Sequence, residues 1–421
     1  MKLVRKRLSF THGLALSALL IVAAASIHAG DEIAGKRVII YYPNWGCYAG
    51  HKNFQVGNIP WDKITHINHA FMMVGKDNKL AYTDEWADRN MAFKHSGAFK
   101  GHFGEYLYYK RQYPHVKILV SVGGWTKGNN FHKMALTERS RNTFAKSCVS
   151  FLKSYQFFDG IDIDWEYPGV DRAKDPRDEY DNGCPGGPEG TQNFTLLLKT
   201  LRETFDANGL KDHLLTIAAP AGVELLKRQE PKEYYQYLNF INVMTYDFHG
   251  GTAKISNHHS ALYRNPNDPG SPEYNVDFVA KYFKDTLGIP AAMLNIGVPY
   301  YSHGWKGLKP ESGDNGLFAA VAGPATGVWD NPKCPGGINP YYELSQMEQK
   351  GFVKYFDEVS RVPWLYNPTT GEIFSYDDGK SLAEKCDYIK TNGYGGIMIW
   401  EITGDGPGFP LTNLIFTKMN N

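Results

Sequence analysis

Residues 157–167 have the sequence FFDGIDIDWEY, in which four carboxylates fall within eight residues of an otherwise apolar run. Side chains alternate between the two faces of a β-strand. A strand here therefore places three acids on one face, Asp162, Asp164 and Glu166, and two isoleucines and a tryptophan on the other. We expect the apolar face to pack under helices and the acidic face to line a barrel interior or the edge of a sheet.

Neighbouring acids on one face of a strand lie about 7 Å apart. At this distance their titrations couple, so that one proton is shared and one acid stays protonated at neutral pH, as an acid catalyst requires. Two other interpretations are a solvated edge strand and a site for Ca²⁺ or Mg²⁺. The strict alternation of apolar and acidic residues disfavours the first, and a straight strand suits a cation less well than a loop that wraps around it.

The four acids form the pattern D-x-x-D-x-D-x-E from Asp159 to Glu166, which resembles the signature of family 18 glycoside hydrolases, the chitinases and their relatives. The resemblance extends over about residues 36–411 through five motifs in the same order. It implies hydrolysis of β-1,4 bonds between N-acetylglucosamine units, with chitin and chitooligosaccharides as substrates and no cofactor or metal.

The N-terminus has the layout of a secretory signal peptide. Basic residues within the first seven positions precede an apolar stretch at about residues 14–25, and small residues follow as far as Ala29. The apolar stretch is too short to span a bilayer. We therefore predict a signal peptide over residues 1–29, a secreted, extracellular protein, and no membrane anchor. A net charge of +1 offers no electrostatic reason to expect nucleic acid as a partner.

Aromatic residues make up 14% of the chain, with 27 Tyr and 9 Trp, which is more ring surface than a core alone usually needs. Rings exposed along a cleft would stack on the faces of sugar rings.

The five cysteines allow zero to two disulfides in an oxidising compartment and leave at least one thiol unpaired. No C-x-x-C spacing occurs, so zinc and thiol-redox functions have no support. We expect a monomer.

Short apolar strands alternate with helical patterns along the chain, which is typical of a parallel α/β fold. Eight candidate strands lie at residues 38–42, 64–71, 116–122, 157–167, 214–219, 240–246, 294–299 and 395–400. Helices are expected at about 138–155 and 189–207. Eight strands with helices between them predict a closed (β/α)8 TIM barrel. An open, doubly wound sheet is the alternative, but no glycine-rich phosphate-binding turn follows the first strand.

The segment between the seventh and eighth strands, about residues 306–376, is far longer than a barrel helix needs. It contains a helix-like piece near 343–350 and short aromatic pieces that resemble strands. A loop of this length with its own apolar residues predicts a small inserted α+β domain, and the family resemblance implies the same. We therefore assign residues 30–305 and 377–421 to the barrel and 306–376 to the insertion. A second long excursion covers about residues 73–113.

The chemistry of such a barrel lies at the carboxyl ends of its strands. In the mechanism that the resemblance implies, the N-acetyl oxygen of the substrate attacks the anomeric carbon, an oxazolinium ion forms, and configuration is retained. Glu166 would donate the proton and later activate water. Asp164 would accept a hydrogen bond from the acetamido N–H, while Asp162 beneath it tunes the shared proton. Tyr246 would donate to the acetamido carbonyl.

Substrate binding is assigned to residues at the same strand ends. These are Tyr42, Trp125, Met244, Asp247, Tyr301 and Trp400. The resemblance makes Trp400 the ring on which the distorted sugar stacks and Asp247 the acid that supports the catalytic geometry, although a Trp that closes a strand is as often part of a core. Trp125 is equally compatible with either role. Small residues in the S-x-G-G motif at 121–124 would allow close backbone approach.

One residue departs from the family pattern. Many relatives carry arginine two residues after the tyrosine that follows the seventh strand, whereas this chain has His303 there. An imidazole lacks the fixed fork of donors and the permanent charge of arginine. We expect altered, pH-dependent substrate contacts next to the cleavage site, and no effect on the proton donor.

Two other functions stay open at this point. The first is a non-catalytic chitin-binding lectin, although family lectins typically lack the glutamate or another signature acid, and all four acids are present here. The second is an endo-β-N-acetylglucosaminidase that acts on other glycans, against which the insertion and the Tyr246–Asp247 pair argue. Cleavage of chitotetraose or of a glycoprotein glycan would separate these functions.

Overall fold

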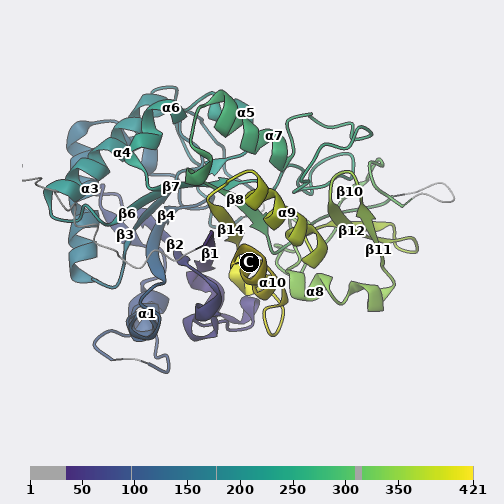
Figure 1. The fold of residues 1–421 in the computed structure, drawn as a ribbon, viewed down its shortest axis with the longest axis horizontal. Helices are drawn as coiled ribbons and strands as arrows, with labels where there is room; N and C mark the ends of the chain where they lie inside the picture. The colour runs from purple at the N-terminus through teal and green to yellow at the C-terminus, as the bar shows by residue number, and fades with distance from the viewer. Residues whose placement is uncertain (1–34, 96, 177, 309–314, 421) are drawn as a thin grey trace, which may run out of the picture. The chain divides into compact units, whose positions relative to one another are not determined.

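A computed structural model describes residues 35–95, 97–176, 178–308 and 315–420 (Figure 1). The predicted signal peptide lies outside the described residues. Eight parallel strands form the central sheet: β1 (Arg37–Pro43), β2 (His66–Val74), β4 (Lys117–Gly123), β5 (Gly160–Asp164), β6 (Leu214–Pro220), β7 (Phe240–Met244), β8 (Leu294–Pro299) and β14 (Gly396–Trp400). They are ordered β1-β14-β8-β7-β6-β5-β4-β2, and β1 also pairs with β2. The sheet therefore closes, and the predicted (β/α)8 barrel is confirmed.

The acidic stretch alternates between the faces of β5 as predicted. Ile161, Ile163 and Trp165 belong to the large core that the barrel shares with its surrounding helices. Trp165, for example, stacks on Phe131 with ring centroids 5.3 Å apart. The acids face the opposite side, where Asp162 is fully buried inside the barrel. The apolar burial on the outer face thus fixes which way the acids point.

Helices follow the strands around the barrel (Figure 1). They are α1 (Gly101–Gln112), α2 (Phe131–Ala135), α3 (Glu138–Ser154), α4 (Gly190–Ala207), α5 (Val223–Leu226), α6 (Pro231–Tyr234), α7 (Val276–Lys281), α9 (Gly379–Thr391) and α10 (Pro410–Asn420). The two helices predicted at 138–155 and 189–207 are α3 and α4. The start of α3 is fixed by a capping box, in which the Thr137 hydroxyl accepts from the Ser140 amide.

A second sheet lies between β8 and α9 in the sequence. Its five strands are antiparallel: β9 (His303–Lys306), β10 (Gly323–Pro324), β11 (Val353–Asp357), β12 (Val362–Asn367) and β13 (Glu372–Ser375). A helix, α8 (Tyr341–Leu344), and a 3-10 turn (Met347–Lys350) replace the single helical piece expected at 343–350. Separate apolar clusters form under this sheet. The boundaries of an insertion domain stay a prediction, although β9 already begins at His303.

The excursion after β2 contains a short strand, β3 (Leu80–Tyr82), which pairs antiparallel with β2, and then α1. The five cysteines all lie in the described ranges and form no disulfide with one another. Within those ranges, the helices are too short or too polar to cross a membrane.

Candidate active site

The deepest acid at the carboxyl end of β5 is Asp162, which is fully buried. Three hydroxyl groups donate to its carboxylate: Tyr41 at 2.8 Å, Ser121 at 2.8 Å and Thr216 at 2.5 Å. Burial raises the pKa of Asp162, and these hydrogen bonds oppose the shift. The barrel strands β1, β4 and β6 thus each contribute one donor to the same carboxylate.

Asp164 lies two residues after Asp162, on the same face of β5, and is 4% exposed. Its Oδ1 has no hydrogen-bond partner among the described residues. Burial raises the pKa of Asp164 well above its usual value, and the charges of Glu166 and Asp162 add to the effect. We infer that the three acids together hold at least one proton near neutral pH.

Glu166 stands just beyond the end of β5 and is 8% exposed. Burial raises its pKa to about 7, although a hydrogen bond from Tyr167 and the charge of Arg172 oppose the shift. A carboxyl group with this pKa can donate a proton and take one back at neutral pH. Of the three acids on this face, Glu166 therefore has the properties of an acid–base catalyst.

Arg172, which the sequence analysis did not single out, holds this part of the site together. Its guanidinium makes two contacts with the buried Asp181 carboxylate, at 2.7 and 3.1 Å. The same group donates to the Trp125 carbonyl and lies 3.9 Å from the centre of the Trp125 ring, and its Nε donates to the Glu166 carbonyl at 3.4 Å. One arginine therefore fixes both an aromatic side chain and the backbone of the acid.

Tyr246 follows β7 and is 9% exposed. The hydrogen bond that the structure gives its hydroxyl is a weak one, to the Met398 sulfur at 3.8 Å. Burial raises the pKa of Tyr246 well above its usual value, and the neighbouring acids, Asp247 first, add to this. The hydroxyl therefore keeps its proton and can donate it to a better acceptor.

Asp247 accepts hydrogen bonds on one carboxylate oxygen, Oδ1. Tyr301 donates at 2.5 Å, and His303 Nε2 lies at 2.8 Å. His259 Nδ1 stands 3.7 Å from the same oxygen, just beyond hydrogen-bond range. Desolvation by the surrounding protein opposes ionisation of Asp247, but the two imidazoles outweigh it and lower the pKa of its carboxyl group far below the usual value. Because 53% of the side chain is exposed, solvent screens part of these interactions. His303 thus pairs with Asp247 from the position where arginine was expected.

Trp400 ends β14 and belongs to a ring cluster at the inner side of the barrel. Its ring stacks on Phe71, with centroids 5.6 Å apart and planes 24° apart, and meets the edge of Tyr41 at 5.5 Å. Met244, at the end of β7, packs partly buried against the same cluster. The cluster also includes Tyr246 and Tyr301, so four of the predicted residues are brought together here.

The structure does not bring Tyr42 to this site. Its side chain is fully buried in the outer core, where its hydroxyl donates to the Phe54 carbonyl at 2.9 Å. Neighbouring residues of a strand face opposite sides, so the preceding Tyr41 points inward and donates to Asp162 instead. The prediction for Tyr42 is corrected accordingly.

Two glycines of the S-x-G-G motif allow the close approach that was expected. A Cβ on Gly123 would lie 2.1 Å from the Asp164 carbonyl oxygen. A Cβ on Gly124, which has φ +76°, would lie 2.6 Å from the Phe71 ring. The ring under Trp400 could not occupy its place if Gly124 carried a side chain.

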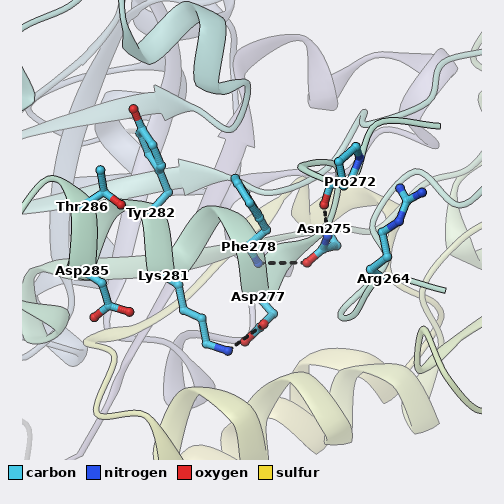
Figure 2. Close-up of a pocket in the computed structure, with 9 residues that line it drawn as sticks. All are labelled: Arg264, Pro272, Asn275, Asp277, Phe278, Lys281, Tyr282, Asp285 and Thr286. Atoms are coloured by element: carbon cyan, nitrogen blue, oxygen red, sulfur yellow. Dashed lines mark hydrogen bonds and ion pairs between the residues drawn. The ribbon is translucent and has the colours of Figure 1, made fainter. Parts of the chain in front are cut away.

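A pocket of about 400 Å³ lies apart from these residues, along α7 (Figure 2). Arg264, Phe278 and Tyr282 are among its lining residues, and none of the predicted site residues lines it. Its lysine, Lys281, is paired with Asp277 at 2.9 Å. Since it holds no coupled acids, we do not assign the chemistry to it.

Buried carboxyl groups beside aromatic rings, at the carboxyl end of a (β/α)8 barrel, are typical of a glycoside hydrolase. The family model of glycosyl hydrolases family 18 matches residues 37–405, and the chain belongs to this family.

The chain is similar to known chitinases along most of its length. It is 33% identical to chitinase A1 of Niallia circulans over 95% of this chain and 61% of that protein. It is 30% identical to endochitinase 1 of Metarhizium robertsii over 91% of this chain and 86% of that protein. Among solved structures, a chitinase from Bacillus thuringiensis superposes with a TM-score of 0.83 at 35% identity, covering 91% of this chain and 69% of that chain. The chain therefore spans less than two thirds of the Niallia protein.

Proposed function

We propose that the protein hydrolyses β-1,4 bonds between N-acetylglucosamine units of chitin and chitooligosaccharides, with the acetamido group of the substrate as nucleophile and with retention of configuration. The observation that carries this proposal is Glu166, a buried acid with a pKa of about 7 directly beyond the buried Asp164. The relatives named as chitinases support the choice of substrate.

The proton of Glu166 would pass to the glycosidic oxygen as the bond to the leaving sugar breaks. The acetamido oxygen would attack the anomeric carbon from the opposite side. Tyr246 would donate to that oxygen and hold it in line, and Asp164 would accept from the acetamido N–H. Oδ1 of Asp164 is suited to this because no described residue donates to it.

The reaction would finish with water. Glu166, now a carboxylate, would take a proton from a water molecule, whose oxygen attacks the anomeric carbon and opens the oxazolinium ring. Glu166 is then protonated again, and the new hydroxyl stands on the face that the leaving group occupied. Asp162, whose carboxylate accepts hydrogen bonds from three hydroxyls, would tune the proton that the acids share.

In this scheme the sugars would be bound by Trp400, Trp125, Met244, Asp247 and Tyr301. Trp400 offers a ring supported from behind by Phe71, and Trp125 offers one held by Arg172.

We further propose that the protein is secreted through residues 1–29 and acts as a monomer on extracellular chitin. Export of a fusion of residues 1–29 to a reporter enzyme would test the first of these statements.

The catalytic assignment is tested with chitotetraose and the Glu166→Gln variant. Glutamine keeps the shape of the side chain but cannot transfer the proton, so turnover should fall by at least about 10²- to 10⁴-fold while oligosaccharide binding persists. Glu203→Gln is the matched control, because Glu203 is 65% exposed on α4. Retained turnover in Glu166→Gln would overturn the assignment. Binding without cleavage by the wild type would indicate a lectin, and cleavage of glycoprotein glycans alone would indicate a different substrate.

A further inference from the structure

Asp247, His259 and His303 form a cluster with a composition typical of metal sites. One ligand atom from each of the three side chains lies within 4.8 Å of the other two. The residues come from two separate segments: Asp247 and His259 lie in the segment between β7 and α7, and His303 begins β9. No single sequence motif therefore indicates the cluster, and the sequence analysis predicted no metal.

The distances in this cluster suit a transition metal ion. Zn²⁺ binds imidazole nitrogen and carboxylate oxygen at about 2.0–2.2 Å, which places tetrahedral ligand atoms about 3.3 Å from one another. Asp247 Oδ1 lies 2.8 Å from His303 Nε2 and 3.7 Å from His259 Nδ1. These two distances bracket the required separation, so shifts of about half an ångström would bring both of them to it.

His259 provides an independent indication. It is fully buried, and neither ring nitrogen has a hydrogen-bond partner within normal distance among the described residues. A buried polar group without a partner costs free energy, and such groups are rare in folded proteins. Its Nδ1 faces the Asp247 carboxylate just beyond hydrogen-bond range. An ion bound between them would give this nitrogen the partner that it lacks.

A second cluster of the same composition differs in this respect. His69, Asp88 and His102 also lie close together, but all three are fully buried. His69 contacts Tyr106 and Asp88, at 3.0 and 2.9 Å, and His102 contacts Tyr42 and Asp88, both at 3.2 Å. All four ring nitrogens have partners, so this cluster is a hydrogen-bond network of the core. The Asp247 cluster, by contrast, is open to solvent through a carboxylate that is 53% exposed.

We propose that Asp247, His259 and His303 bind a divalent transition metal ion of the Zn²⁺ or Cu²⁺ type. Two imidazoles and one carboxylate are donors that these ions favour, and a water molecule would take the fourth position. Ca²⁺ and Mg²⁺ are not the ions that this site would prefer, because they require oxygen donors.

Metal binding would also inhibit the enzyme, a consequence that rests on the proposed function. Asp247 accepts from Tyr301, and both residues are assigned to sugar binding. An ion on Oδ1 would compete with Tyr301 for that oxygen and bring a positive charge and a water molecule into the space of the sugar. We therefore expect reversible inhibition that a chelator relieves.

The test compares Zn²⁺ binding to the wild type and to His303→Arg by calorimetry, after treatment with EDTA and dialysis. Arginine can still donate to Asp247 but has no lone pair for a metal. We expect the variant to fold and to bind Zn²⁺ at this site at least about 10- to 100-fold more weakly. Loss of a residue that merely hydrogen-bonds a metal ligand already costs that much, and His303 is itself a ligand. His213→Gln, a histidine outside the cluster, should bind like the wild type. In the wild type, Cu²⁺ should show nitrogen hyperfine splitting in electron paramagnetic resonance.

Equal Zn²⁺ affinity in the wild type and His303→Arg, or no binding to the wild type, would overturn the proposal. If His303→Arg does not fold, the same comparison is made with His259→Gln. Inhibition is measured separately, as chitotetraose turnover with Zn²⁺ and after EDTA. Since calorimetry needs no turnover, binding that depends on His303 in a protein that cleaves no chitotetraose would refute the proposed function and leave the metal site standing.

Discussion

The Tyr246→Phe variant separates a catalytic hydroxyl group from a structural one. In the free protein this hydroxyl is buried. Among the described residues, its hydrogen-bond partner is the Met398 sulfur, at 3.8 Å. Sulfur is a weak acceptor. The hydroxyl therefore contributes little to folding and stands ready to donate to a carbonyl oxygen of a bound substrate.

The magnitudes follow from that arrangement. Removal of one preorganised donor to an oxygen that reacts costs about 10²- to 10³-fold in kcat, or about 3–4 kcal/mol of transition-state stabilisation. The cost in unfolding free energy should stay below about 1 kcal/mol, because no strong hydrogen bond of the free protein is lost. The rate should thus fall far more than the stability, and kcat more than KM.

The assay measures kcat and KM on chitotetraose together with the urea midpoint of unfolding. Tyr234→Phe is the matched control, since Tyr234 is a buried tyrosine whose hydroxyl donates to Gln229 at 3.2 Å outside the site. It should lose about 1 kcal/mol of stability and keep its rate. An unchanged kcat in Tyr246→Phe, or a rate loss explained by unfolded protein, would refute the reasoning.

Two further predictions concern pH and stability. Because burial raises the pKa of Glu166 to about 7 and the acid must be protonated, kcat/KM should fall about tenfold per pH unit above that value. The charge of Arg172 lowers this pKa, so Arg172→Met should move the descending limb to higher pH; a shift to lower pH in the pH–rate profile would contradict the assignment. Lys385→Met should cost about 3–5 kcal/mol in urea unfolding, because it leaves the fully buried Asp377 carboxylate, 2.6 Å away, without its cation. Lys418→Met, which breaks an exposed pair that solvent screens, should cost far less stability, and equal losses in the two variants would count against the buried pair.

The barrel strands could be predicted because each is a short apolar run between polar segments, and the structure places all eight within a few residues of the expected bounds. The acids of β5 were assigned to the correct face because isoleucine and tryptophan alternate with them. In β1 the run Val38–Tyr42 is apolar at every position, since parallel strands are buried on both faces. No alternation distinguished Tyr41 from Tyr42, and the prediction chose the wrong one.

Other parts of the site depend on contacts between distant segments. Arg172 and Asp181 lie in a loop after β5 without periodic pattern, and only the folded chain places the guanidinium over Trp125. His259 gave no signal either, because nothing in its sequence neighbourhood points to Asp247. His303 could be recognised as a departure from the family, but its partner could not. These contacts depend on which loops meet at the strand ends, and local sequence does not encode that arrangement.

The most direct test of the central claim is the anomeric form of the first product. Proton NMR of chitotetraose during the first minutes of digestion distinguishes the two anomers before they interconvert. Attack by the acetamido oxygen followed by water, with Glu166 as acid and then base, predicts that the wild type releases the β-anomer first and that Glu166→Gln releases almost none. An α-anomer as the first product would contradict retention, and with it the assignment of the acetamido group as nucleophile.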